Sequence, residues 1–175
     1  MSQQESQPQE IWKGFHWSFF INIQGLIICL RRFELKLMEG DLEQAQLELK
    51  TATKLMLASG AAMQLAGSIN PQTYADEVRP SMMPPDVKSH DFSGLMSWEH
   101  AVLIKLWKQL RCHFCNLPIE LQSQHQEFVD AYLHLAHSHR SVCEKFGGDE
   151  AGSLRFEGGT AVNVLDAFTH SRYRF

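Results

Sequence analysis

Residues 132–160, YLHLAHSHRSVCEKFGGDEAGSLRFEGGT, place a row of histidines at the end of a predicted helix and follow it with two glycine pairs. The first pair, Gly147-Gly148, ends the helix because glycine is a poor helix former. The second pair precedes Thr160. This order suggests a metal-ligating imidazole beside a flexible backbone loop that can close on a small molecule. The rest of the chain is then expected to form helices around this site.

Apolar residues recur at three- and four-residue steps in four segments of the chain, which predicts four long helices. Three of them cover 11–38, 42–65 and 119–146, and another follows residues 97–100 and carries the apolar residues of 102–110. Asp41, with Gln44 three residues later, is a good N-cap for the second helix, and Pro118 suits the first position of the fourth. The first helix is apolar around most of its circumference between residues 19 and 30, so we expect that part to be buried on several sides.

Four prolines between residues 68 and 94 forbid a long helix there, namely Pro71, Pro80, Pro84 and Pro85. The fold class predicted from this pattern is all-α, a bundle of four long helices with one proline-rich crossing loop and a glycine-rich C-terminal segment. Residues 1–10 are predicted to be a flexible arm and residues 11–175 a single helical domain.

Composition limits the possible classes of function. The chain has 175 residues, 44% of them hydrophobic and 21% charged, and a net charge of −4, which gives no basic face for nucleic acid. The most apolar run, residues 19–30, is interrupted by Asn22 and Gln24 and is shorter than the roughly 20 residues of a membrane span. Four scattered cysteines and the absence of a basic, apolar leader favour reduced thiols and a cytoplasmic location.

Two metal sites can be considered from spacing alone. His134 and His137 share a helical face, but the Glu-x-x-His pairs typical of di-iron bundles are missing. Cys112 and Cys115 form a C-x-x-C motif, yet the chain has no second pair to complete a zinc site. Spacing does not single out His139 among the nine histidines.

A resemblance to a known family singles out His139. The segment HRSVCEKF (139–146) and the later Gly158-Gly159-Thr160 resemble the heme-ligand helix and glycine loop of the tryptophan and indoleamine 2,3-dioxygenases. Upstream, FFINIQ (19–24) looks like the heme-pocket helix of that family, and FSGLMS (92–97) looks like its S-G-F-Q-S segment. These matches occur in the same order as in the family and cover most of the chain.

The resemblance implies a heme-binding domain with heme b, in which His139 binds the iron and the glycine loop closes over the substrate. It also implies substrate binding by Gly158, Gly159 and Thr160. Four helices around a flat apolar cofactor are expected to bury Phe19, Phe20, Trp98 and Trp107 against the heme or an aromatic substrate. A neutral imidazole suits an axial ligand that leaves the opposite face of the iron open.

The chain departs from the family at the residues that bind tryptophan. Ile23 stands where the tryptophan enzymes have a distal histidine, and Ala101 stands where they have the arginine for the substrate carboxylate. His100, beside Ala101, is the candidate catalytic donor or base. Arg79, and Arg172 near the C-terminus, are the candidates for binding an anionic group. Such changes alter the reaction of a heme site within one scaffold.

The function expected from these features is a heme-dependent oxygenase, similar to tryptophan 2,3-dioxygenase, that acts on an indole-like or other small aromatic substrate with dioxygen. Two alternatives are a non-catalytic heme-binding or sensing protein of the same fold and a helical oligomerisation module without a cofactor. The apolar first helix and the assembly of the dioxygenases also predict a homo-oligomer, a dimer or a tetramer, with no nucleic-acid or membrane partner.

Overall fold

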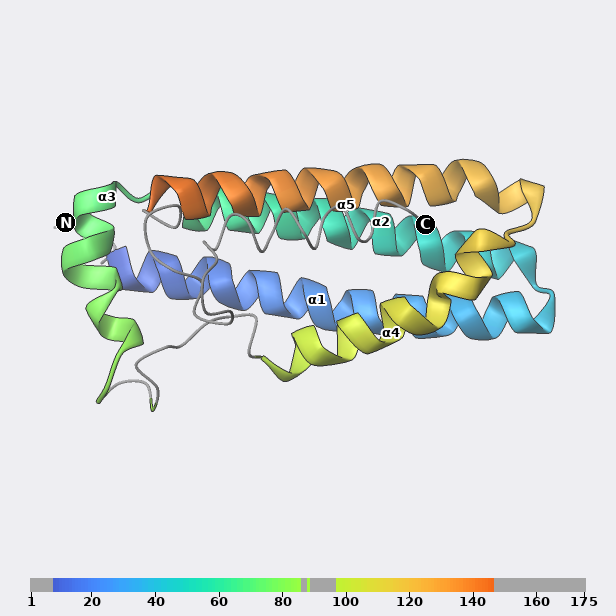
Figure 1. Cartoon of the computed structure of the whole chain (residues 1–175), viewed down its shortest axis with the longest axis horizontal. Coiled ribbons are helices and arrows are strands. Elements are labelled where there is room, and N and C mark those ends of the chain that lie inside the picture. Colours follow the sequence, from blue (N-terminus) through green and yellow to red (C-terminus); the bar gives the residue numbers. More distant parts are fainter. Residues whose placement is uncertain (1–7, 86–87, 89–96, 147–175) are drawn as a thin grey trace, which may run out of the picture.

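A computed structural model describes residues 8–85, 88 and 97–146 of the chain. Its four long helices are α1 (Pro8–Glu39), α2 (Leu42–Ala66), α4 (Trp98–Cys115) and α5 (Ile119–Lys145). Figure 1 shows α1, α2 and α5 running along the long axis of the molecule, with α4 packed across one half of α1. The prediction of an all-α bundle of four long helices is confirmed.

The helix ends follow local capping chemistry. Helix α1 begins at Pro8, three residues earlier than predicted, because a proline in the first turn needs no backbone N–H partner. Asp41 caps α2, its Oδ1 accepting from the Gln44 N–H at 3.2 Å, as predicted. Pro118 lies at the N-cap of α5 with extended ψ, and the prediction of a first helical position is wrong by one residue.

Three short helical turns connect α2 to α4 across one end of the bundle, α3 (Pro71–Thr73), η1 (Tyr74–Val78) and η2 (Pro80–Met82). Pro80 starts η2, and because it lacks an N–H it cannot continue the hydrogen-bonding pattern of the preceding turn. The predicted absence of a long helix is therefore confirmed for residues 71–82. These turns, here called the crossing segment, enclose a small apolar cluster, Trp12, Ala66, Ile69 and Val78.

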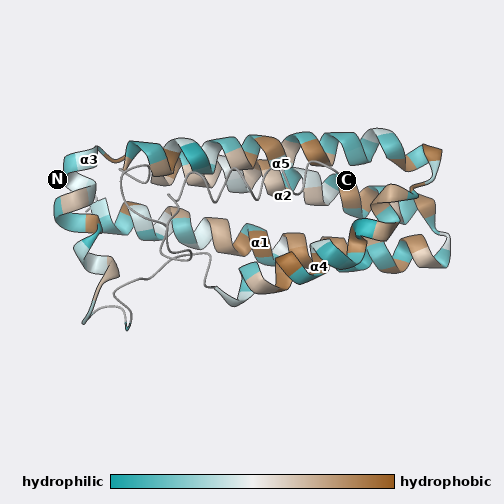
Figure 2. Cartoon of the chain, in the orientation of Figure 1, coloured by the Kyte–Doolittle hydropathy of each residue, from teal (hydrophilic) through white to brown (hydrophobic). Residues whose placement is uncertain are grey.

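The main core lies between the four long helices. Hydrophobic residues concentrate where α1 and α4 meet (Figure 2). The largest fully buried apolar side chains include Ile23, Leu26, Leu30, Phe33, Leu49, Met56, Leu110, Leu121 and Phe128. The expectation that residues 19–30 of α1 are buried on several sides is met only in part: this segment packs against α2 and α4, but Ile21 and Ile28 are 61% and 55% exposed. Neither α1 nor any other described helix combines the length and the apolar character required to cross a membrane.

Candidate functional site

Two glycines fix the position of α5 against α2. Gly60 lies under the backbone of α5, where a Cβ would be 3.5 Å from the Leu135 Cα. At Gly67 a Cβ would approach the Val142 Cγ2 to 2.5 Å, closer than real side chains allow. Because larger side chains would push the helices apart, these contacts set how close α5 comes to α2 and which way the side chains of its last turns point.

Polar groups hold the same turns of α5. Ser138 is 2% exposed, and its hydroxyl donates to the His134 carbonyl at 3.0 Å and accepts from the Gln64 amide at 2.9 Å. Lys145 Nζ donates to the Gly67 carbonyl at 2.6 Å, which satisfies an acceptor at the C-terminus of α2. The helix turn that carries the predicted ligand His139 is therefore anchored on both sides.

His139 is an imidazole that burial keeps neutral. Burial, followed by the electrostatic influence of His16 on α1, lowers the pKa of His139 to about 4. Burial also lowers the pKa of His16, whose Nδ1 lies 3.0 Å from the Trp12 carbonyl. A carbonyl only accepts, so Nδ1 of neutral His16 carries the proton and Nε2 keeps a lone pair. Two neutral imidazoles, from α1 and α5, thus lie near each other.

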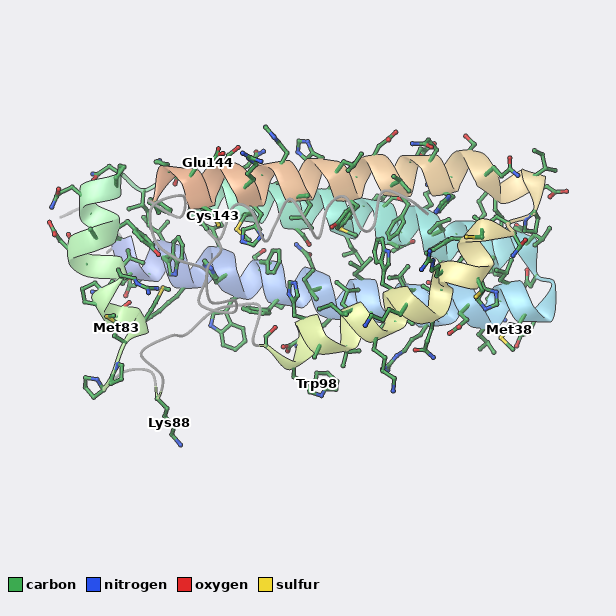
Figure 3. All side chains as sticks on the ribbon, viewed as in Figure 1. Met38, Met83, Lys88, Trp98, Cys143 and Glu144 are labelled. Carbon is green, nitrogen blue, oxygen red and sulfur yellow. The ribbon has the colours of Figure 1, made fainter. Side chains whose placement is uncertain are left out.

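Cys143 follows His139 by one helical turn. Figure 3 shows Cys143 directed toward the inside of the bundle and Glu144 directed outward. Burial, assisted by the charge of Glu144, raises the pKa of the Cys143 thiol to about 11. This thiol is therefore protonated at neutral pH and is a neighbour of the imidazole rather than an anionic ligand.

Aromatic rings close this end of the bundle. The Trp12 ring centroid lies 4.2 Å from that of His16 and 5.1 Å from that of Tyr74, and Tyr74 stacks on Phe146 at 3.9 Å. Burial raises the pKa of Tyr74, while a hydrogen bond from Arg79 opposes the rise and Cys143 adds to it. The candidate anion-binding Arg79 therefore lies at the same end of the bundle as His139.

His100 lies in the first turn of α4, which Ser97 caps by accepting from the His100 N–H at 3.2 Å. The adjacent Glu99 accepts from the Gln24 amide of α1 at 3.1 Å. Gln24 is eight residues after His16, a rise of about 12 Å along α1. The first turn of α4, which carries His100, therefore contacts α1 about 12 Å along that helix from His16, the neighbour of His139.

The remaining predicted heme contacts differ in their surroundings. Phe19 and Phe20 are half-buried on α1 between His16 and Gln24, with their ring centroids 5.7 Å apart. Trp98 is 70% exposed and points away from the bundle (Figure 3). Gly158, Gly159 and Thr160 lie outside the described residues, and the roles of all these residues stay predictions.

Sequence reasoning missed His16 and Tyr74. His16 stands among apolar residues one turn after Trp12, a helical spacing that could have indicated a ring contact. Tyr74 lies in a segment whose periodicity is broken by prolines, so no sequence pattern pointed to it. The proximity of both to α5 arises from how distant segments pack, which spacing along the chain does not reveal.

The alternative metal sites find no support among the described residues. His134 and His137 are exposed on α5, and Cys112 and Cys115 are exposed at the end of α4. No group of three or more histidine, cysteine or carboxylate side chains in residues 8–85, 88 and 97–146 is arranged to hold a metal ion. One neutral imidazole with aromatic neighbours instead fits a group such as heme, which needs a single protein ligand and apolar flanks.

Comparison with known proteins gives two matches. The model of the family described as SfmD 3-methyl-L-tyrosine peroxygenase matches residues 1–127. A 3-methyl-L-tyrosine peroxygenase of Streptomyces lavendulae is 30% identical in an alignment 171 positions long, which covers 92% of this chain and 45% of that protein. The chain thus spans less than half the length of this relative. No solved structure matches.

These matches refine the expectation from the motifs. They point to a peroxygenase family rather than to the tryptophan and indoleamine 2,3-dioxygenases that the motifs resemble, so the wider relationship to those enzymes stays a prediction. The family match ends at residue 127, within α5 and before His139. The role of His139 therefore depends on the geometry of α5 and on the resemblance of its motif.

Proposed function

Because this chain belongs to the SfmD 3-methyl-L-tyrosine peroxygenase family, we propose that it forms the heme-binding part of an oxygenase for a tyrosine-like aromatic amino acid. In this proposal His139 would bind the heme iron. The family membership supports an oxygenase acting on an aromatic amino acid, and the substrate expected here is therefore closer to tyrosine than to an indole.

The observation that carries the proposal is the state of His139. An imidazole with a pKa of about 4 has a free lone pair at neutral pH, which is the form that binds iron. Ordinary histidines are partly protonated near pH 6.5, so binding of iron at His139 would not compete with a proton. Trp12 and Tyr74 supply the apolar, aromatic surroundings that a porphyrin edge requires.

The other residues have supporting roles. Heme supplies an iron centre that transfers oxygen to an aromatic ring. Phe19, Phe20 and Trp98 would pack against the heme or the substrate, and an inward rotation of the exposed Trp98 would accompany binding. His100, in the helical turn that Ser97 caps, would accept a proton from the substrate or return one to it.

Arg79 is proposed to bind the substrate carboxylate. Its hydrogen bond to Tyr74 holds the guanidinium at the end of the bundle that contains His139, and a guanidinium can bind a carboxylate with two hydrogen bonds. Gly158, Gly159 and Thr160 would add backbone N–H groups and a hydroxyl around the amino acid. The substrate ring would then point toward the heme.

The oxygen source distinguishes two reactions. A peroxygenase converts an aromatic C–H and hydrogen peroxide into a phenol and water, with no other reductant, whereas a dioxygenase incorporates both atoms of dioxygen. The relative is called a peroxygenase, which favours peroxide over the dioxygen expected from the dioxygenase motifs. Labelled peroxide and labelled dioxygen, followed by mass spectrometry of the product, distinguish the two.

The first experiment compares absorption spectra of the heme-reconstituted chain and its His139→Ala variant. We expect a Soret band in the unchanged chain that is shifted or lost in His139→Ala, with unaltered far-ultraviolet circular dichroism. His134→Ala is the matched control, since His134 lies on the same helix but is exposed. Identical heme spectra for His139→Ala and the unchanged chain would refute His139 as the ligand, and absence of heme binding would favour a helical module without a cofactor.

A second experiment tests Arg79. Substrate binding, measured by the shift it causes in the heme spectrum, is expected to weaken about tenfold to a hundredfold in Arg79→Ala for tyrosine-like amino acids. Tyramine, which has no carboxylate, should bind equally to both proteins. Equal weakening for tyramine would mean that Arg79 supports the fold of the crossing segment rather than the carboxylate.

A further inference from the structure

Helix α1 carries a line of exposed apolar side chains on its outer face. These residues, here called the α1 outer stripe, are Trp17, Ile21, Ile28, Leu35 and Met38, with exposed fractions of 69%, 61%, 55%, 52% and 72%. At about 100° per residue they fall within one arc of roughly 100°. Single exposed apolar residues are normal on a protein surface, but an aligned series of five along one helix marks an interaction surface.

The spacing of the stripe is nearly symmetric about Ile28. Ile21 and Leu35 lie seven residues before and after it, and Trp17 and Met38 lie eleven before and ten after. An interface with two-fold symmetry requires the same surface to be complementary to itself. In an antiparallel pair of α1 helices centred on Ile28, Ile21 of each copy faces Leu35 of the other, and each Trp17 faces a Met38.

The polar residues within the stripe favour the same orientation. Gln24 lies four residues before Ile28 and Arg31 three after, so an antiparallel pair sets Arg31 of one copy opposite Gln24 of the other. Gln24 is bonded to the Glu99 carboxylate, which brings a negative charge toward that arginine. A parallel pair would instead place Arg31 against Arg31, a like-charge contact that costs stability.

The stripe is also long enough for a stable contact. Residues 17–38 span about 33 Å of helix. Since a helix is about 10 Å wide, the stripe can bury a surface of several hundred Å² per copy. Standard interfaces bury about 800 Å² per partner, and the flanking N-terminus of α4, which contacts the stripe through Glu99 and Gln24, can add to the area. Figure 3 shows Met38, at the far end of the stripe, projecting from the edge of the molecule.

From this symmetry, charge pattern and size, we propose that the chain forms a two-fold dimer in which the α1 outer stripes of two copies pack antiparallel with Ile28 at the axis. The inference does not depend on the proposed heme chemistry, because the stripe lies on the side of α1 that faces away from the core. It gives the expected homo-oligomer a defined surface and a defined symmetry.

Sedimentation equilibrium over a dilution series tests the dimer. The chain is expected to have twice its mass of 20.0 kDa at micromolar concentration. Ile28→Glu places two carboxylates against each other at the axis and is expected to weaken association about a hundredfold or more. Leu57→Glu is the matched control, since Leu57 is an exposed apolar residue on α2 at 45% exposure, outside the stripe. Circular dichroism checks that both variants are folded.

A cross-linking experiment tests the symmetry axis. In a background that lacks the exposed thiols (Cys112→Ser, Cys115→Ser), Ile28→Cys should form a disulfide between copies on oxidation, because a residue on the axis meets itself. Leu57→Cys in the same background should stay uncross-linked. A monomer at the highest concentration of the unchanged chain, or a dimer that Ile28→Glu leaves intact, would overturn the proposal.

Discussion

Val142 of α5 occupies the space in which a side chain on Gly67 of α2 would begin. A Cβ at Gly67 would lie 2.5 Å from the Val142 Cγ2, and the Gly67 carbonyl accepts from Lys145 Nζ at 2.6 Å. The end of α2 and the last turn of α5 therefore fit together only because position 67 has no side chain. His139 is three residues before Val142, so this contact also determines where its imidazole lies.

Replacing Gly67 tests this fit. Gly67→Ala is expected to lower the free energy of unfolding by about 1–3 kcal/mol, because the added methyl group forces α2 and α5 apart. Gly14→Ala is the matched control, since a Cβ at Gly14 meets nothing within 4 Å, and alanine in an exposed helix should stabilise by about 0.5–1 kcal/mol. Urea unfolding followed by circular dichroism measures both, and equal effects of the two substitutions would refute the packing argument.

The pKa of His139 predicts how the stability of the heme-free protein depends on pH. Since the folded pKa of about 4 lies below the unfolded value of 6.5, the unfolded chain binds more protons between these values. The contribution of neutral His139 to the free energy of unfolding is therefore fully present above about pH 6.5. As the pH falls toward 4, the free energy of unfolding decreases by up to about 3 kcal/mol.

His139→Gln should flatten this dependence when urea unfolding is compared at several pH values. Burial lowers the pKa of His16 and His125 as well, so a slope of the same sign should remain in the variant. An unchanged slope in His139→Gln would mean that the imidazole is not buried in solution.

Much of the fold could be predicted because helix periodicity and capping act locally. Asp41 caps α2 by accepting from the Gln44 N–H, as expected, and no long helix forms across the prolines between residues 71 and 85. The exposure of Ile21 and Ile28 could not be predicted, since an apolar side chain has the same sequence signal whether it faces the core of its own chain or a partner.

The site could be predicted only in part, because some of its residues are brought together by contacts between distant segments. His139 was identified by a motif resemblance, and its partial burial follows from the packing of α5 on α2. His16 and Tyr74 are brought to this end by contacts between segments far apart in the sequence, and nothing in their local sequence requires such contacts. Arg79, chosen for its charge, lies with them because of its hydrogen bond to Tyr74.

The four cysteines should differ in reactivity. Cys112 and Cys115 are exposed, whereas burial raises the pKa of Cys29 and raises that of Cys143 to about 11, from an ordinary value of 9.0. The thiolate is the reacting form, so Cys143 should react about a hundredfold more slowly than an ordinary thiol. Titration of the folded heme-free chain with a chromogenic disulfide should show two fast thiols, located by mass spectrometry at 112 and 115. Fast modification of Cys143 would contradict its burial.

The guanidinium of Arg32 stabilises the buried carboxylate of Glu48. Arg32 Nη2 lies 2.7 Å from the Glu48 Oε1, and the Glu48 side chain is only 7% exposed. Arg32→Ala leaves a buried charge with one fewer partner and is expected to cost about 2 kcal/mol of unfolding free energy. Lys36→Ala, which removes a partly exposed pair with Glu39, should cost less than about 1 kcal/mol.

A neutral replacement distinguishes charge from packing at this position. Glu48→Gln in the Arg32→Ala background should recover part of the lost stability, because an amide requires no counter-charge when buried. Urea unfolding of the four proteins at pH 7 measures these differences. If Arg32→Ala costs no more than Lys36→Ala, then water rather than Arg32 stabilises the Glu48 carboxylate, and the ion pair between α1 and α2 does not help to hold the bundle together.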